Sequence, residues 1–203
     1  MTRYGVQARR LLLAALMAQM VAGTAWAHRL ITAETQPSSA EAAIHIKRFA
    51  VSQVYYSEVE PERPTTWFTF QGEAGDRVVL SLGVPVIHRL EGFRPVVVLI
   101  GPGLPEQTLP FASPAATGRI YEPAAEPAVF HEHVTGTDSW MLVREETVLP
   151  ETGRYYLAAY AGGDLPDRPK LWLSIGYLER FKLRDILGFF GIRRHVRRFH
   201  EIR

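Results

Sequence analysis

The sequence of 203 residues contains no cysteine, which excludes thiol catalysis, thiolate metal sites and disulfide exchange. Its 23 basic and 21 acidic residues are unevenly spread: residues 180–203 hold eight basic and two acidic residues, whereas residues 28–179 hold 12 basic and 19 acidic ones, a net charge of −7. An acidic body with a basic end favours a surface partner for that end and argues against nucleic-acid binding.

Residues 1–27 have the order of a secretory signal. Arg3, Arg9 and Arg10 precede an apolar run over residues 11–17, and small residues end at Ala27. Cleavage after Ala27 leaves His28 as the first residue of the mature chain, and an uncleaved anchor is the alternative. The sequence therefore predicts a periplasmic or secreted protein with a signal at residues 1–27, a domain at 28–179 and a tail at 180–203.

The domain alternates with a period of two, which predicts strands. We expect about eight strands, at residues 43–59, 66–71, 77–83, 94–103, 128–134, 139–144, 149–161 and 170–179. The connection at residues 73–76 contains Gly75 and predicts a hairpin. Residues 94–103 are apolar throughout, so they predict a central strand, and the proline-rich residues 104–127 predict a long surface loop. This pattern indicates an all-β, two-sheet antiparallel β-sandwich of jelly-roll-like form.

The tail is a basic amphipathic helical segment. Ile192, Val196, Phe199 and Ile202 recur at helical spacing. Gly188 and Gly191 predict two short helices rather than one. In one interpretation, the phenylalanines and other apolar residues of the tail dock on the sandwich. In the other, the tail lies on an anionic membrane surface or a membrane-bound protein. The residues expected at that contact are Phe181, Phe189, Phe190, Arg193, Arg194, Arg197 and Arg198.

Three stretches carry a family resemblance: WFTFQGEAGDRVVLSL at residues 67–82, RPVVVLIGPG at 94–103 and LPETGRYYLAAY at 149–160. They resemble the bacterial pre-peptidase C-terminal-like domains, over roughly residues 43–176. The closing GYLERFKLRDIL at 176–187 is similar to the tail of a group of exported bacterial proteins built on this sandwich. The resemblance implies a secreted β-sandwich with a binding or accessory role, and it supplies no catalytic residues.

A copper site is the alternative function. His131 and His133 lie two residues apart in a predicted strand, where side chains share a face, and imidazole is a good copper ligand. His28 as a free amino terminus adds an amine and a ring nitrogen, giving an arrangement that resembles the histidine brace of lytic polysaccharide monooxygenases. In the simpler interpretation no cofactor is expected, and His131 and His133 are polar side chains that face water.

The remaining residues indicate no enzyme. The sequence holds no G-x-S-x-G, no H-E-x-x-H and no glycine-rich phosphate loop. We expect His45, His88, His195 and His200 to be surface or capping residues and not ligands. We therefore predict an exported, non-catalytic binding or accessory protein that lies at the membrane surface through its tail. The alternative is a periplasmic copper protein that uses His28 with His131 or His133.

Overall fold

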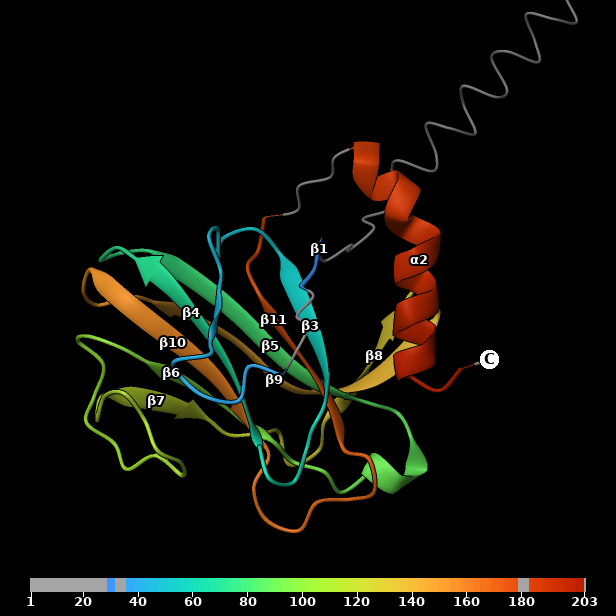
Figure 1. The fold of residues 1–203 in the computed structure, drawn as a ribbon, viewed down its shortest axis with the longest axis horizontal. Helices are drawn as coiled ribbons and strands as arrows, with labels where there is room; N and C mark the ends of the chain where they lie inside the picture. Colours follow the sequence, from blue (N-terminus) through green and yellow to red (C-terminus); the bar gives the residue numbers. More distant parts are fainter. Residues whose placement is uncertain (1–28, 32–35, 179–182, 203) are drawn as a thin grey trace, which may run out of the picture.

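The computed structural model describes residues 29–31, 36–178 and 183–202, with the side chains of residues 183–189 outside that description. The predicted signal, His28 and Phe181 therefore lie outside the described residues. Two facing sheets form a sandwich (Figure 1), one in the order β1-β3-β11-β5-β9-β8 and the other in the order β2-β4-β10-β6-β7. The predicted all-β, two-sheet sandwich is confirmed.

The strands in chain order are β1 (Arg29–Leu30), β2 (Ile44–His45), β3 (Gln53–Glu58), β4 (Thr65–Gly72), β5 (Arg77–Pro85), β6 (Val96–Ile100), β7 (Gly118–Tyr121), β8 (Ala128–Glu132), β9 (Thr137–Val148), β10 (Gly153–Tyr160) and β11 (Lys170–Ile175). A short 3-10 helix, η1 (His88–Leu90), follows β5, and the helix α2 (Leu183–Phe199) follows β11. The short strands β1 and β2 pair parallel to β3 and β4, and the other neighbours are antiparallel.

The predicted hairpin at residues 73–76 is wrong, because β4 and β5 belong to different sheets. The turn instead carries the chain from one sheet to the other. Gly75, at φ +91°, donates its N–H to the carbonyl of Leu149 at 2.9 Å, and the N–H of Leu149 donates to the carbonyl of Asp76 at 2.9 Å. The N–H of Ala74 donates to Oγ1 of Thr152 at 3.0 Å. The turns at residues 73–76 and 149–152 both lie in stretches that carry the family resemblance, and together they form one corner of the sandwich.

The predicted strand at residues 43–59 divides into β2 and β3, one in each sheet. Residues 104–127 are not only a loop, because β7 lies within them and pairs with β6. The same segment covers the outer face of the five-stranded sheet, where Phe111 packs edge-on against Trp67 with ring centroids 5.2 Å apart. The strand β6 is thus buried on both faces, which explains its continuous apolar sequence.

Tyr155 marks the centre of the main core between the sheets. Its ring is fully buried, stacks on Phe70 at a centroid distance of 5.8 Å, and leaves no room for a side chain at Gly101. The hydroxyl lies 2.7 Å from the carbonyl of Glu151 and 2.8 Å from that of Pro102. Burial of a large ring with a satisfied hydroxyl ties β10 to the turns at its end.

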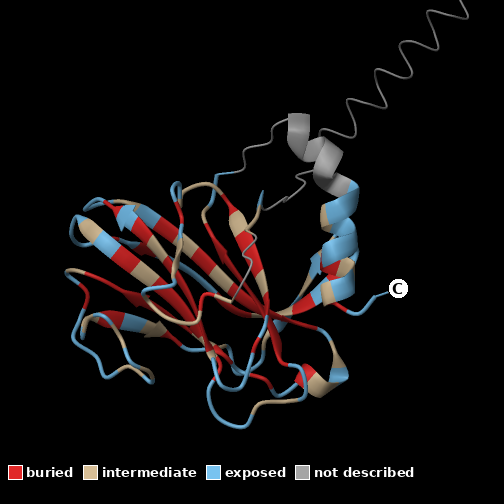
Figure 2. Cartoon of the chain, viewed as in Figure 1, coloured by how far each residue is buried: buried red, intermediate tan, exposed pale blue. Residues whose placement is uncertain are grey.

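The tail forms one continuous helix, so the prediction of two short helices is wrong. Each glycine costs only about 1 kcal/mol of helix stability relative to alanine, and packing against the sandwich offsets such a cost. The helix α2 lies beside the six-stranded sheet (Figure 1), with its exposed side turned away from the sandwich (Figure 2). Within the described part of the chain, no helix has both the length and the apolar character needed to cross a membrane.

Candidate binding surface on the C-terminal helix

One face of α2 packs on the outer face of the six-stranded sheet. Tyr55 and Leu171 point into the main core, so their neighbours Tyr56 and Trp172 point outward, beneath the helix. Phe199 packs edge-on against Tyr56 with ring centroids 4.9 Å apart. Val196 is only 2% exposed. The apolar spacing noted in the sequence thus identifies the docking face, although Ile202 lies beyond the helix and is exposed.

A buried chain of hydrogen bonds holds the end of this face. The indole Nε1 of Trp172 donates to Oγ of Ser139 at 3.0 Å, and that oxygen lies 3.0 Å from Nε2 of His200. Nδ1 of His200 lies 2.8 Å from the carbonyl of Val196. A carbonyl only accepts, so Nδ1 of His200 carries a proton. In the neutral ring Nε2 then has no proton, and it accepts the hydroxyl hydrogen of Ser139. The imidazole is neutral in this arrangement.

His200 was expected to be a surface or capping residue. Its ring is only 6% exposed and its Nδ1 lies against the carbonyl of Val196 at the end of α2, so it caps the helix and does not face water. Burial is the largest effect and lowers the pKa of His200, while the hydrogen bond to the carbonyl of Val196 raises it. The charge of Lys170 lowers this pKa and that of Asp138 raises it, both by less. Tyr56 also lies against this ring, with centroids 6.3 Å apart, and burial raises its pKa.

Ion pairs hold Glu201, the residue that follows His200. The carboxylate of Glu201 accepts hydrogen bonds from both terminal nitrogens of Arg89, at 2.7 and 2.9 Å, and from Nζ of Lys170 at 2.8 Å. These bonds lower the pKa of Glu201 to about 2. Lys170 is only 3% exposed and also donates to the carbonyl of Phe199 at 3.1 Å. We call Ser139, Lys170, Trp172, His200 and Glu201 the C-terminal latch.

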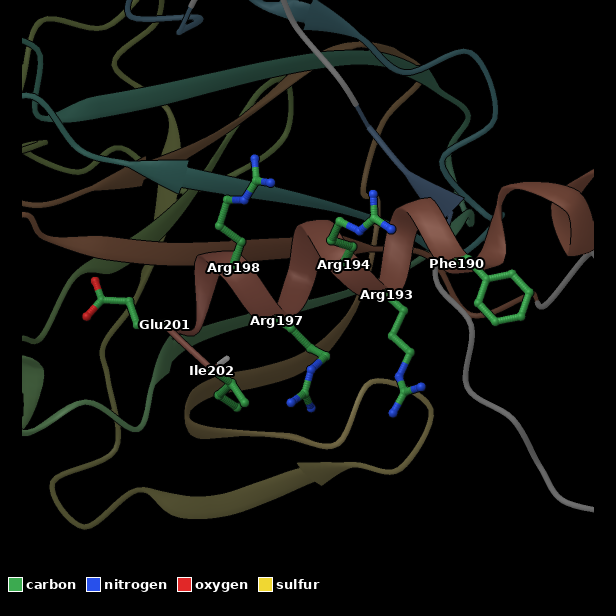
Figure 3. Close-up of a pocket in the computed structure, with 7 residues that line it drawn as sticks. All are labelled: Phe190, Arg193, Arg194, Arg197, Arg198, Glu201 and Ile202. Atoms are coloured by element: carbon green, nitrogen blue, oxygen red, sulfur yellow. The ribbon is translucent and has the colours of Figure 1, made fainter.

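The opposite side of α2 is strongly basic. Arg193, Arg194 and Arg198 are exposed, and Phe190 is 75% exposed. The arginines project in two directions around the helix, with Arg194 and Arg198 on one side and Arg193 and Arg197 on the other (Figure 3). They border an open groove of about 580 Å³ that reaches Phe190 at one end and Ile202 at the other. We call Phe190 and these four arginines the arginine face.

The sequence predicted this grouping, and the structure brings Phe190, Arg193, Arg194, Arg197 and Arg198 together on one helix. Arg197 is partly buried and donates to the carbonyl of Thr135 at 3.3 Å. The side chain of Phe190 is 75% exposed, whereas the first interpretation of the tail expected it to dock on the sandwich. The side chain of Phe189 and all of Phe181 lie outside the described residues.

Of the proposed copper ligands, the structure brings His131 and His133 close to one another. The strand β8 ends at Glu132, so only His131 lies in it, yet the rings of His131 and His133 are 4.7 Å apart between centroids. Nδ1 of His131 is 2.5 Å from Oδ1 of Asp138, and these side chains are half exposed. In the described part of the chain no three metal-binding side chains form a cluster.

His28 lies outside the described residues, but its neighbour Arg29 begins β1, at the edge of the sheet opposite β8. Pairing across the sheet places Arg29 in the row of Glu145 on β9, whereas His131 pairs with Asp138, seven residues away along that strand. Five strand spacings separate the two edges, roughly 24 Å in a flat sheet. The topology therefore separates Arg29 from the histidine pair.

No family model matches the chain, and no curated protein matches its sequence. Among solved structures, the chain is similar to a pre-peptidase C-terminal domain of collagenase from Bacillus anthracis, at 13% identity and a TM-score of 0.39, covering 66% of this chain and 93% of that one. Pre-peptidase C-terminal domains are also the group that the strand sequences resemble.

Two further structures are similar. One is the secreted copper-binding protein MopE of Methylococcus capsulatus, at 14% identity and a TM-score of 0.30, covering 56% of this chain and 70% of that one. The other is an alpha-L-fucosidase from Vibrio sp. strain EJY3, at 16% identity and a TM-score of 0.34, covering 66% of this chain and 24% of that one. Similarity this distant carries no argument about ligand or activity.

Proposed function

We propose that this chain is an exported, non-catalytic accessory protein that binds the surface of anionic phospholipid membranes through the arginine face of α2. The observation that carries the proposal is the placement of four arginines and a 75% exposed phenylalanine on one side of a helix whose other side is docked. Among the described residues, Phe190 is the most exposed large apolar side chain.

The chemistry of the arginine face suits a membrane interface. Guanidinium groups form paired hydrogen bonds with phosphate oxygens, and aromatic rings settle at the level of the head groups. Each basic side chain near an anionic surface contributes about 1 kcal/mol to binding. The domain at residues 28–179 carries a net charge of −7 and is repelled by the same surface. The opposite charges of helix and domain therefore favour one orientation, with α2 toward the lipid.

Co-sedimentation with lipid vesicles tests the proposal. The purified chain is mixed with vesicles of phosphatidylcholine, with or without phosphatidylglycerol. We expect binding only to the anionic vesicles. Replacing Arg193, Arg194 and Arg198 by glutamine removes about 3 kcal/mol, which corresponds to roughly 100-fold weaker binding.

The matched control replaces Arg48, Arg63 and Arg154, which are exposed and lie on the sandwich, by glutamine. This variant has the same net charge as the first but an intact arginine face, so we expect it to bind nearly as well as the parent chain. Equal losses in the two variants contradict the proposal, because they indicate a response to net charge alone.

A further inference from the structure

We propose that α2 is a releasable amphipathic helix: protonation of His200 opens the C-terminal latch, and the freed apolar face of the helix then enters the interface of an anionic phospholipid membrane. This inference rests on the proposed function and adds its regulation. In the latched state the protein meets the membrane with the arginine face. In the released state the face that now packs on the sheet also becomes available to lipid.

In the part of α2 whose side chains the structure describes, residues 190–199, the apolar face is small, and the polar contacts of this part lie at its C-terminal end. Ile192 and Phe199 are partly buried, Val196 is buried, and Val196 belongs to neither hydrophobic cluster of the sandwich. Residues 197–201 supply hydrogen bonds and ion pairs to Thr135, Ser139, Lys170 and Arg89. Loss of this end therefore removes much of what keeps the helix on the sheet.

His200 can act as the trigger because protonation reverses its hydrogen bond with Ser139 and places a charge at a buried site. A second ring proton, on Nε2, turns the acceptor of the Ser139 hydrogen into a donor. Ser139 already accepts from Trp172, so its own hydrogen must then find another acceptor. The charge also appears at a site only 6% exposed. Each effect favours release of the ring into water.

The charged groups around His200 partly oppose one another. Lys170 on β11 disfavours the protonated ring, and Asp138 on β9 favours it. Glu201 is paired with Lys170 and with Arg89 from η1, while Tyr56 on β3 contributes an aromatic ring. The net result is a lowered pKa for His200 in the docked state, which burial dominates.

The direction of the response follows from this lowered pKa. The undocked ring binds a proton more readily than the docked ring, so docking is fully stable above pH 6.5, the ordinary value, and weakens as the pH falls below it. An anionic membrane attracts protons and lowers the pH at its surface by about half a unit at ordinary surface potentials. The proposed partner therefore assists the release.

The absence of cysteine allows a clean test, because one introduced thiol is the only one in the chain. Val196→Cys places the thiol on the docked face. Gly191→Cys is the matched control on the same helix, at an exposed position where a Cβ meets nothing within 4 Å. The measured quantity is the rate at which a thiol reagent labels position 196 divided by the rate at which it labels position 191, across the pH range and without lipid.

We expect this ratio to rise as the pH falls below 6.5, up to tenfold for each unit by which the docked and undocked pKa values of His200 differ. Adding His200→Gln to the Val196→Cys chain should flatten the profile, since the amide oxygen accepts from Ser139 and does not titrate. A flat ratio in the cysteine variants that keep His200 overturns the latch, and so does a rise that survives His200→Gln. Neither result affects the proposed surface binding, which co-sedimentation measures separately.

A second measurement tests insertion. A polarity-sensitive dye on the thiol of the Val196→Cys chain should shift to shorter wavelength with phosphatidylglycerol vesicles below pH 6.5, and should not shift at pH 8 or with phosphatidylcholine alone. Anionic vesicles that bind the protein at both pH values without a shift of this dye contradict insertion while leaving surface binding intact. A shift equal in the His200→Gln background contradicts the role of His200.

Discussion

Replacing Glu201 by glutamine tests how firmly the latch holds the end of α2. The carboxylate accepts three hydrogen bonds from Arg89 and Lys170, at 2.7 to 2.9 Å. Glutamine keeps the size of the side chain but removes its charge. Lys170, only 3% exposed, then keeps Glu58 at 3.8 Å as its remaining carboxylate partner.

The magnitude follows from the pKa of Glu201, which lies at about 2 against an ordinary value of 4.5. A difference of this size corresponds to at most about 3 kcal/mol. The side chain is 35% exposed, so water screens part of this energy and we expect about 1 to 2 kcal/mol. Because folding lowers the pKa of this acid, its stabilisation is complete above pH 4.5 and is lost as the pH falls toward 2.

Hydrogen exchange at the amides of His200 and Ile202 measures this energy, because their N–H groups donate to the carbonyls of Val196 and Arg197 at the helix end. At neutral pH, Glu201→Gln should lower the protection factors by roughly 5- to 30-fold, the change that corresponds to about 1 to 2 kcal/mol. The control is Glu60→Gln, which breaks an exposed pair with Arg63 and should leave the same amides unchanged. Unchanged protection in Glu201→Gln, or a loss that persists undiminished near pH 2, refutes the reasoning.

Three further predictions concern the sheet, the core and copper. Gly83→Ala places a Cβ in the position of the Trp172 indole, so we expect a loss of about 1 to 3 kcal/mol in urea unfolding and a release of α2 seen as weaker His200 protection. Tyr155→Phe keeps the stacked ring but loses the hydroxyl bonds, and the free energy of unfolding should fall by about 1 to 2 kcal/mol. If His28 begins the mature chain and binds copper in a brace, one glycine added before it should abolish a nitrogen-rich copper(II) resonance signal; a signal that survives the glycine assigns the copper to other donors, such as His131 and His133.

The sequence predicted the sandwich well because alternation and turn residues are local signals. Those signals do not say which strands pair. The turn at residues 73–76 has the composition of a hairpin, but besides its internal hydrogen bonds it also bonds to Leu149 and Thr152, far along the chain. The strand β7 is only four residues long and lies among prolines, so periodicity could not reveal it.

In the candidate site, too, the sequence predicted what depends on local spacing and missed what depends on distant contacts. Helical spacing alone placed the four arginines on a common side of α2, because a helix fixes the positions of its own residues. The latch was missed because its members come from distant segments: Ser139 lies 61 residues from His200, and Trp172 lies 33 residues from Ser139. A histidine in a basic tail carries no local sign that a serine and an indole lie beneath it.

Whether α2 meets an anionic membrane is tested most directly by a dye at the arginine face itself. Phe190→Cys puts a polarity-sensitive label at the exposed end of the face, and Val148→Cys puts the same label on the sandwich, at a side chain that is 59% exposed. With phosphatidylglycerol vesicles at neutral pH, we predict a shift to shorter wavelength at position 190 and none at position 148. The absence of a shift at position 190 in vesicle-bound protein, or equal shifts at both positions, contradicts binding through this helix.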